Sequence, residues 1–131
     1  MRKLYLIIIV VAVIIAAFLI FRGSEDSWIK DENGSYVKHG APAETPDYVT
    51  EQQTAVMQAL QLYNSKKAEG IIFSSQCLGT VGENIKYAVD IVHIPRTEDD
   101  NKLENQCQDY RNGKVSHFIE LDKDGHIFRI S

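Results

Sequence analysis

The sequence predicts an α+β protein, in which one N-terminal transmembrane helix precedes a small α-β-β-α-β-β domain with a four-stranded antiparallel sheet. Three observations predict this class. An unbroken apolar run fills residues 4–21, and a helix of that length matches the hydrocarbon thickness of a bilayer. Stretches with helical and with alternating apolar spacing then follow one another along residues 50–131. A chain of 131 residues leaves room for one small domain.

The apolar run begins at Leu4, ends at Phe21 and contains no charged residue. As a helix it spans about 27 Å, at ~1.5 Å per residue. Arg2 and Lys3 precede it, as in a secretory signal, but a cleavable signal needs a shorter apolar core and small residues before the cut. We therefore predict a retained membrane anchor, preceded by a cytoplasmic tip of residues 1–3. A cleaved signal peptide is the alternative.

Residues 22–49 predict a short hairpin followed by a linker. Asn33 and Gly34 stand between two β-prone stretches and tolerate the positive φ angles of a two-residue turn. Residues 40–46, which contain two prolines, are typical of a linker. The stretch WIKDENGSYVKHGAP, residues 28–42, resembles a segment of small, membrane-anchored, uncharacterised proteins of ultrasmall bacteria. This resemblance implies a membrane-anchored location and no activity.

The α+β domain, residues 50–131, is predicted to begin with a helix. Thr50 and Gln53 match a capping box, in which each side chain bonds the other residue's free backbone N–H. An apolar stripe follows at helical spacing, made of Val49, Val56, Ala59, Leu60 and Tyr63. Gly70 suits the exit of this helix, because glycine adopts the left-handed conformation in which many helices end.

Two apolar stretches, residues 71–81 and residues 85–94, predict the first two strands. Gly82, Glu83 and Asn84 separate them, and a short polar separator is typical of an antiparallel pair. In the second stretch Lys86 and Asp90 are predicted to point away from the core, because the side that faces the core is shared by Ile85, Tyr87, Val89, Ile91 and His93.

Residues 97–112 predict a second helix. Thr97 is its cap, and the acidic residues that follow favour the positive end of the helix dipole. Leu103, Cys107 and Tyr110 lie at positions i, i+4 and i+7, so they form a narrow stripe that we expect to be buried.

The chain closes with a predicted hairpin of residues 115–121 and 126–130, around Asp124 and Gly125. A two-residue turn at this point sets three cross-strand pairs, namely Leu121 with Phe128, Ile119 with Ile130 and Glu120 with Arg129. The first two pairs are apolar and the third is an ion pair, so the turn chemistry and the residue pattern agree.

Cys77 and Cys107 are the only cysteines. Cys77 shares its strand parity with Phe73 and Val81, which we expect to point inward, and Cys107 lies on the apolar stripe of the second helix. We therefore predict a disulfide, which closes a loop of about 30 residues and contributes roughly 3–4 kcal/mol. Two buried free thiols, or cysteines with a catalytic or metal-binding role, are the alternatives.

Location follows from the cysteines and from the charges beside the apolar run. Disulfides persist outside the cytoplasm, and Arg2 and Lys3 favour a cytoplasmic N-terminus. The predicted location is therefore the membrane, with the N-terminus cytoplasmic and the C-terminal domain extracytoplasmic.

Charge excludes one class of partner. The chain has 14 basic and 18 acidic residues. Two of the basic residues precede the apolar run, so residues 22–131 carry 12 basic against 18 acidic residues. Nucleic-acid binding takes most of its affinity from phosphate neutralisation, so we expect no nucleic-acid partner. The predicted partners are the membrane and an envelope protein, with no small-molecule ligand.

The outer face of the predicted sheet is the candidate binding surface. Five apolar residues have the parity opposite to the proposed core: Ile72, Leu78, Val92, Ile94 and Phe118. They give this face more apolar area than a surface without a partner needs.

No residue is predicted to be catalytic or to hold a metal or cofactor. Zinc sites pair their ligands at close spacing, which the four histidines do not show: His39, His93, His117 and His126. The chain also contains no phosphate-binding loop, no Gly-x-Ser-x-Gly elbow and no His-Glu-x-x-His motif.

These observations predict a single-pass, membrane-anchored, extracytoplasmic domain that acts as a non-catalytic binding module of the cell envelope. One alternative is a minor hydrolase that uses Cys77 with a nearby histidine. Another is an accessory subunit of a larger membrane complex.

Overall fold

The computed structural model describes residues 1–23 and 26–131. Its elements, in chain order, are α1 (Arg2–Gly23), β1 (Ser27–Lys30), β2 (Tyr36–His39), α2 (Asp47–Ala68), β3 (Gln76–Val81), β4 (Tyr87–Ile91), the 3-10 turns η1 (Glu98–Asn101) and η2 (Leu103–Asn105), α3 (Gln108–Arg111), β5 (His117–Leu121) and β6 (Ile127–Ile130). The chain is therefore a mixed α+β protein with an apolar N-terminal helix, as the sequence predicts.

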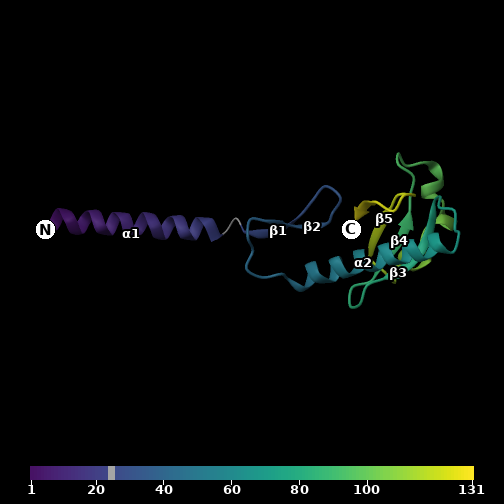
Figure 1. Ribbon diagram of the computed structural model, residues 1–131, viewed down its shortest axis with the longest axis horizontal. Helices are drawn as coiled ribbons and strands as arrows, with labels where there is room; N and C mark the ends of the chain where they lie inside the picture. Colours follow the sequence, from purple (N-terminus) through teal and green to yellow (C-terminus); the bar gives the residue numbers. More distant parts are fainter. Residues whose placement is uncertain (24–25) are drawn as a thin grey trace.

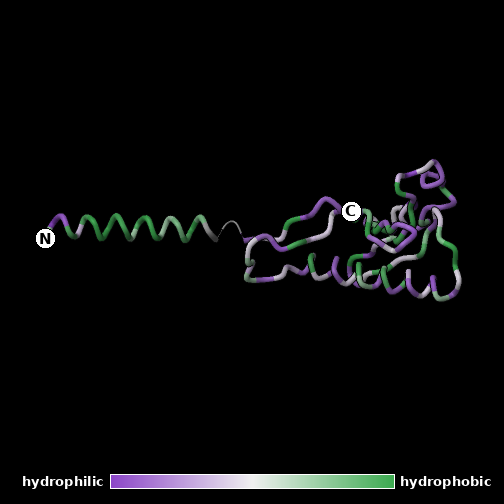
Figure 2. Tube along the Cα trace, turned by 45° about the horizontal axis from the view of Figure 1, so that its top comes forward, coloured by the Kyte–Doolittle hydropathy of each residue, from purple (hydrophilic) through white to green (hydrophobic). Residues whose placement is uncertain are grey.

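Helix α1 projects away from the rest of the molecule (Figure 1) and is apolar along nearly all of its length (Figure 2). The 20 residues from Arg2 to Phe21 are long and apolar enough to span a membrane, and none of the span is buried inside the protein. Burial in the domain therefore does not account for the composition of this helix.

The main sheet has the strand order β3-β4-β5-β6. β3 pairs with β4 and β5 pairs with β6 in antiparallel fashion, but β4 and β5 are parallel. The prediction of an all-antiparallel sheet is therefore wrong. The chain leaves β4 at Ile91 and re-enters the sheet at His117, a connection long enough for the crossover that a parallel pair requires. β1 and β2 form a separate two-stranded sheet.

Both faces of the main sheet are covered. The buried side of α2 packs against one face, where the core cluster is Ala55, Ala59, Tyr63, Tyr87, Val89, Ile91, Ile119, Leu121 and Ile130. Ala88 points to the opposite face, because successive residues of a strand alternate. There it forms a second cluster with Cys107 and Val115, against which Phe118 packs. The crossover connection thus covers the face that α2 leaves open.

Helix α2 begins three residues before the predicted start at Thr50. The Pro46 carbonyl accepts the N–H groups of Val49 and Thr50, so Thr50 lies inside the helix and does not cap it. The predicted capping box of Thr50 and Gln53 is therefore wrong. Pro46 takes the cap position with φ −62°, and Gly70, with φ +81°, follows the helix end as predicted.

The predicted helix over residues 97–112 is also wrong in most of its length. The segment forms two 3-10 turns and the single α-helical turn α3. Lys102 and Gln106 have extended backbone, with ψ 134° and 150°, which interrupts any continuous helix. Leu103 is 60% exposed as a result. The predicted cap is present, because Thr97 and Asp100 form a capping box at the start of η1.

Register shifts in two strands change which side chains face the core. In β3 the pairing shifts between Cys77 and Gly79, so Cys77 lies opposite Asp90 while Gly79 lies opposite Val89. Such a bulge inserts one residue and inverts the parity of the strand before it. Cys77 therefore lies on the face away from α2, and the inward orientation predicted for it is wrong.

The closing hairpin has a similar shift. Ile119 pairs with Ile130 and Glu120 pairs with Arg129, as predicted. Beyond the shift at Glu120 and Leu121, however, Leu121 pairs with Ile127 and not with Phe128. The turn is the cause, because Asp122 accepts the backbone N–H groups of Asp124 and His126 and so tightens the hairpin end.

The β1–β2 hairpin docks onto the domain. The Gln52 side chain accepts the Tyr36 N–H at 2.9 Å and donates to the Gly34 carbonyl at 3.0 Å. At the hairpin tip, Ile130 N–H donates to the Asn33 carbonyl at 2.7 Å. Gly34 has φ +85°, and a Cβ there would overlap the Ile130 carbonyl. The hairpin is thus fixed between α2 and β6.

Candidate functional site

Cys77 and Cys107 form a disulfide, with their Cα atoms 4.8 Å apart. It ties β3 to the residue that precedes α3, on the sheet face away from α2. Cys77 is exposed and Cys107 is buried. Because a bonded sulfur is not a nucleophile, Cys77 in this state cannot supply the chemistry of the hydrolase alternative. A persistent disulfide is typical of an oxidising compartment.

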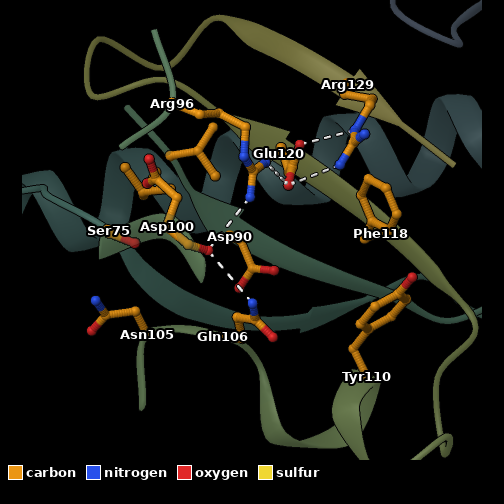
Figure 3. Close-up of a pocket in the computed structure, with 12 residues that line it drawn as sticks. Ser75, Asp90, Arg96, Asp100, Asn105, Gln106, Tyr110, Phe118, Glu120 and Arg129 are labelled. Atoms are coloured by element: carbon orange, nitrogen blue, oxygen red, sulfur yellow. Dashed lines mark hydrogen bonds and ion pairs between the residues drawn. The ribbon is translucent and has the colours of Figure 1, made fainter. Parts of the chain in front are cut away.

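A cavity of about 150 Å³ lies on the same sheet face, and we call it the sheet-face cavity (Figure 3). Strands β4, β5 and β6 supply one side of it, and the crossover connection supplies the other. Its polar lining consists of Ser75, Asp90, Arg96, Asp100, Asn105, Gln106, Glu120 and Arg129. Its apolar lining consists of Ile91, Val92, Tyr110 and Phe118. The cavity is therefore rich in charge for its size.

Glu120 binds both arginines of this cavity. Its Oε1 accepts from Arg96 Nη1 at 2.6 Å, and its Oε2 accepts from Arg129 Nε at 3.1 Å. The Arg129 guanidinium also lies 4.9 Å from the centroid of the Phe118 ring. The Glu120 side chain is 8% exposed, and a carboxylate so buried requires charged partners. Both arginines of the cavity thus form ion pairs with Glu120.

Asp90 forms no ion pair within residues 1–23 and 26–131. It accepts a hydrogen bond from the Cys107 N–H at 3.2 Å, and its carboxylate points among the lining residues (Figure 3). Burial raises the pKa of Asp90 to about 6, and the charge of Glu120 acts in the same direction, while the Cys107 N–H and Arg96 oppose the rise. Asp90 is therefore a destabilised carboxylate facing a small cavity.

A second cavity, of about 380 Å³, lies where β4 ends and where β5 turns into β6, and we call it the edge cavity. Its apolar lining consists of Phe73, Val92, Ile94 and Pro95. Its polar lining consists of Ser74, His93, Thr97, Asp122, Lys123 and Asp124. Compared with the sheet-face cavity, it is larger and more apolar.

His93 connects the edge cavity to a buried carboxylate. Its Nδ1 lies 3.1 Å from Asp100 Oδ1, and its Nε2 lies 3.4 Å from Ser74 Oγ. Asp100 Oδ1 also accepts the His93 backbone N–H at 3.0 Å, and its Oδ2 accepts the Thr97 N–H at 2.6 Å. Serine, imidazole and carboxylate therefore lie in one hydrogen-bonded line.

The charge of Asp100 determines which atoms donate and which accept in these hydrogen bonds. Burial alone would raise the pKa of Asp100, but the hydrogen bonds from Thr97 and His93 outweigh burial and hold it at about 2. Asp100 is thus ionised at neutral pH and can only accept hydrogen bonds. We assign the His93 proton to Nδ1 on this ground. Nε2 then accepts from the Ser74 hydroxyl.

The five residues of the predicted binding surface lie in different parts of the structure. Val92 is 4% exposed and lines both cavities, while Phe118 lines the sheet-face cavity and Ile94 the edge cavity. Leu78 packs against the core beneath α2, because the bulge in β3 inverts its parity. Ile72 is 90% exposed and lines neither cavity. The five residues therefore do not make one continuous face.

One group of side chains has the composition of a metal site. The nearest ligand atoms of Cys77, Asp90 and Cys107 lie within 4.8 Å of one another. Both sulfurs belong to the disulfide, however, and only a thiolate is a good metal ligand. These residues could hold a soft cation only after reduction of the disulfide.

No sequence pattern indicates Ser74 or Asp100 as a site residue, and His93 is one of four histidines without the close spacing of metal ligands. The three residues precede β3, follow β4 and lie in η1, and no short motif joins them. The one available signal was the Thr97 cap with its acidic residues, which places Asp100 at the start of a turn. Comparison of the chain with protein-family models, curated proteins and solved structures gives no match.

Proposed function

We propose that the protein is a single-pass membrane-anchored module, with its N-terminus in the cytoplasm, that binds a basic side chain of an envelope protein in the sheet-face cavity. The observation that carries the proposal is the carboxylate of Asp90. It faces a cavity whose two arginines are already paired with Glu120.

Three features support the location. The apolar helix α1 contributes no buried surface to the domain, as expected of an anchor whose surroundings are lipid. The Cys77–Cys107 disulfide favours an oxidising compartment for the domain. Arg2 and Lys3 at the other end of α1 favour a cytoplasmic N-terminus.

Charge supports a basic ligand. The lining has three carboxylates, those of Asp90, Asp100 and Glu120, against the guanidinium groups of Arg96 and Arg129. With all of them ionised, the lining carries one net negative charge. A ligand that brings one positive charge neutralises it and gives Asp90 the partner that it lacks.

The size and rim of the cavity support a side chain as the ligand. A volume of about 150 Å³ suits the end of one side chain. Tyr110 and Phe118 pack edge to face, with their centroids 5.4 Å apart, and aromatic rings favour the alkyl stem and the charged end of lysine or arginine.

Binding of two matched probes to the full chain in detergent micelles tests this proposal. Nα-acetyl-lysine amide and Nα-acetyl-norleucine amide differ only in the ammonium group, and NMR shifts of the Val92 and Phe118 amides report occupancy of the cavity. We expect the lysine probe to bind more tightly by about tenfold or more, the effect of one charge-assisted hydrogen bond.

The variant Asp90→Asn should remove this preference, because the amide keeps the shape of the side chain and loses its charge. Glu104→Gln is the matched control, since Glu104 is exposed and lines neither cavity. Equal binding of the two probes to the unaltered chain, or an unchanged preference in Asp90→Asn, would refute the proposed site.

A further inference from the structure

The edge cavity places a nucleophile and a base, Ser74 and His93, beside an apolar space, and the carboxylate of Asp100 lies on the far side of the base. We propose that Ser74, His93 and Asp100 form an acyl-transfer centre that hydrolyses carboxylic esters with a short apolar acyl group. This activity is separate from the proposed binding of basic side chains, because its nucleophile and base line a different cavity, although Asp100 lines the sheet-face cavity as well.

The geometry gives each residue one role. Ser74 is exposed, so its Oγ can reach a substrate. It lies 3.4 Å from His93 Nε2, a distance within the range that such pairs show before a substrate is bound. Asp100 lies on the other side of the ring, at 3.1 Å from Nδ1. A hydroxyl, an imidazole and a carboxylate in this order generate a nucleophile at neutral pH.

Asp100 is a positioning residue in this scheme. Its side chain is fully buried, and four groups of His93 and Thr97 bond it: two backbone N–H groups, the Thr97 hydroxyl and His93 Nδ1. It therefore holds the imidazole in one orientation with the proton on Nδ1. It also stabilises the imidazolium that forms when the ring takes a second proton, at Nε2.

The reaction is balanced by these groups, the ester and water. Ser74 Oγ forms a bond to the acyl carbon while its proton passes to His93 Nε2. The ester C–O bond breaks, and the departing alkoxide takes that proton and leaves as an alcohol. Water then attacks the acyl-serine and gives its proton to Nε2. The acid is released when Ser74 Oγ leaves and recovers the proton.

The lining of the cavity indicates the substrate class. Phe73, Val92, Ile94 and Pro95 offer apolar contact to an acyl chain, and the volume is about 380 Å³.

Covalent labelling of the full chain in detergent micelles tests the proposal directly. A fluorophosphonate probe reacts with a serine only where a neighbouring base activates it. We expect stoichiometric labelling, with the adduct assigned to Ser74 by fragment-ion mass spectrometry. Hydrolysis of p-nitrophenyl butyrate should accompany it.

Three variants separate catalysis from structure. Ser74→Ala should abolish labelling, and both Ser74→Ala and His93→Gln should lower kcat/KM for the butyrate ester by about 100-fold or more. Ser65→Ala is the matched control, because Ser65 is an exposed serine of α2 and lines neither cavity. It should keep both activities.

Ser74 is exposed, and the contact of its hydroxyl with His93 lies at the surface. We therefore expect Ser74→Ala to fold, and the NMR amide spectrum checks this. Absence of an adduct on Ser74 in the unaltered chain would overturn the proposal. Ester hydrolysis that persists unchanged in folded Ser74→Ala would overturn it as well.

Discussion

The burial of the Asp90 carboxyl group, and with it its raised pKa, depends on which segment covers strand β4. The alternation in residues 85–94 correctly predicts that Asp90 points away from the core beneath α2. In an open antiparallel sheet that direction leads to water. Here it leads beneath the crossover connection, and among the described residues only the Cys107 N–H donates a hydrogen bond to the Asp90 carboxylate. The sequence therefore predicts correctly on which side of the strand Asp90 lies. It does not reveal the crossover connection, which buries the Asp90 carboxylate.

A pH-dependent stability follows for this residue. Burial raises the pKa of Asp90 to about 6, whereas an unfolded aspartate titrates near 3.9, so the folded state binds more protons between about pH 4 and pH 6. The contribution of Asp90 to the free energy of unfolding thus falls as the pH rises through this window. We expect Asp90→Asn to be more stable than the unaltered chain at pH 7, by up to about 3 kcal/mol, and nearly equal to it at pH 4.

Urea unfolding at pH values from 4 to 7 measures this difference. Asp100 does not interfere, because its pKa of about 2 places its titration below the window and its contribution cancels between the two chains. The exposed control Glu104→Gln should give a difference that does not vary in this way. A parallel pH dependence of Asp90→Asn and the unaltered chain would contradict the assigned environment of Asp90.

At the scale of elements, the sequence predicts the features that depend on the residues of a single helix or hairpin. Helix α2, its apolar stripe and its exit at Gly70 follow from local spacing, as does the pairing of Glu120 with Arg129. The two bulges do not, because each depends on how a strand meets its neighbour. The bulge in β3 inverts the parity at Cys77, and yet the disulfide forms, because Cys107 lies on the same, unpredicted face.

The site residues lie beyond such local patterns. Ser74 precedes β3, whereas His93 and Asp100 lie in the connection between β4 and β5, and the pairing of β3 with β4 brings the two segments together. The predicted helix over residues 97–112 would have placed Asp100 in its first turn with no reason to face His93. The short 3-10 turn η1 instead directs Asp100 inward. A single polar residue in a loop carries no periodic signal, so reasoning from spacing could not identify it.

The Gln52 side chain contributes to the docking of the β1–β2 hairpin, together with the backbone bond from Ile130 to Asn33, and this leads to a prediction at the same scale. Gln52 is 3% exposed and makes two hydrogen bonds to the hairpin, to Tyr36 and to Gly34. Gln52→Ala removes both, so we expect a loss of about 1–3 kcal/mol in the free energy of unfolding. Hydrogen exchange at the Tyr36 amide should accelerate, because a two-stranded hairpin alone is marginal in water.

The neighbouring Gln53 provides the control, because it is exposed and belongs to the same helix. Gln53→Ala changes helix propensity by the same amount and leaves the hairpin contacts intact. Exchange at Tyr36 should then stay slow. If the two alanine variants exchange alike, the hairpin is held by contacts other than those of Gln52.

At the scale of the whole molecule, the proposed membrane location rests on the apolar helix α1, which is long and apolar enough to span a membrane. Of the residues 4–21, fourteen are Leu, Ile, Val or Phe. At roughly −0.3 to −0.6 kcal/mol each, they favour membrane insertion by about 4–8 kcal/mol, and one arginine at the centre opposes it by about 2.5–3.5 kcal/mol. A single central arginine therefore leaves insertion favourable, and two nearly cancel it.

We expect Val11→Arg to remain in the membrane fraction after alkaline carbonate extraction, and the double variant Val11→Arg with Ile14→Arg to appear in the soluble fraction. The pair Val11→Leu with Ile14→Leu is the control and should remain in the membrane. In sealed right-side-out vesicles, external protease should digest the domain of every retained chain. Release of the unaltered chain into the soluble fraction would contradict the proposed anchor, because alkaline carbonate removes proteins that only protein contacts hold at a membrane.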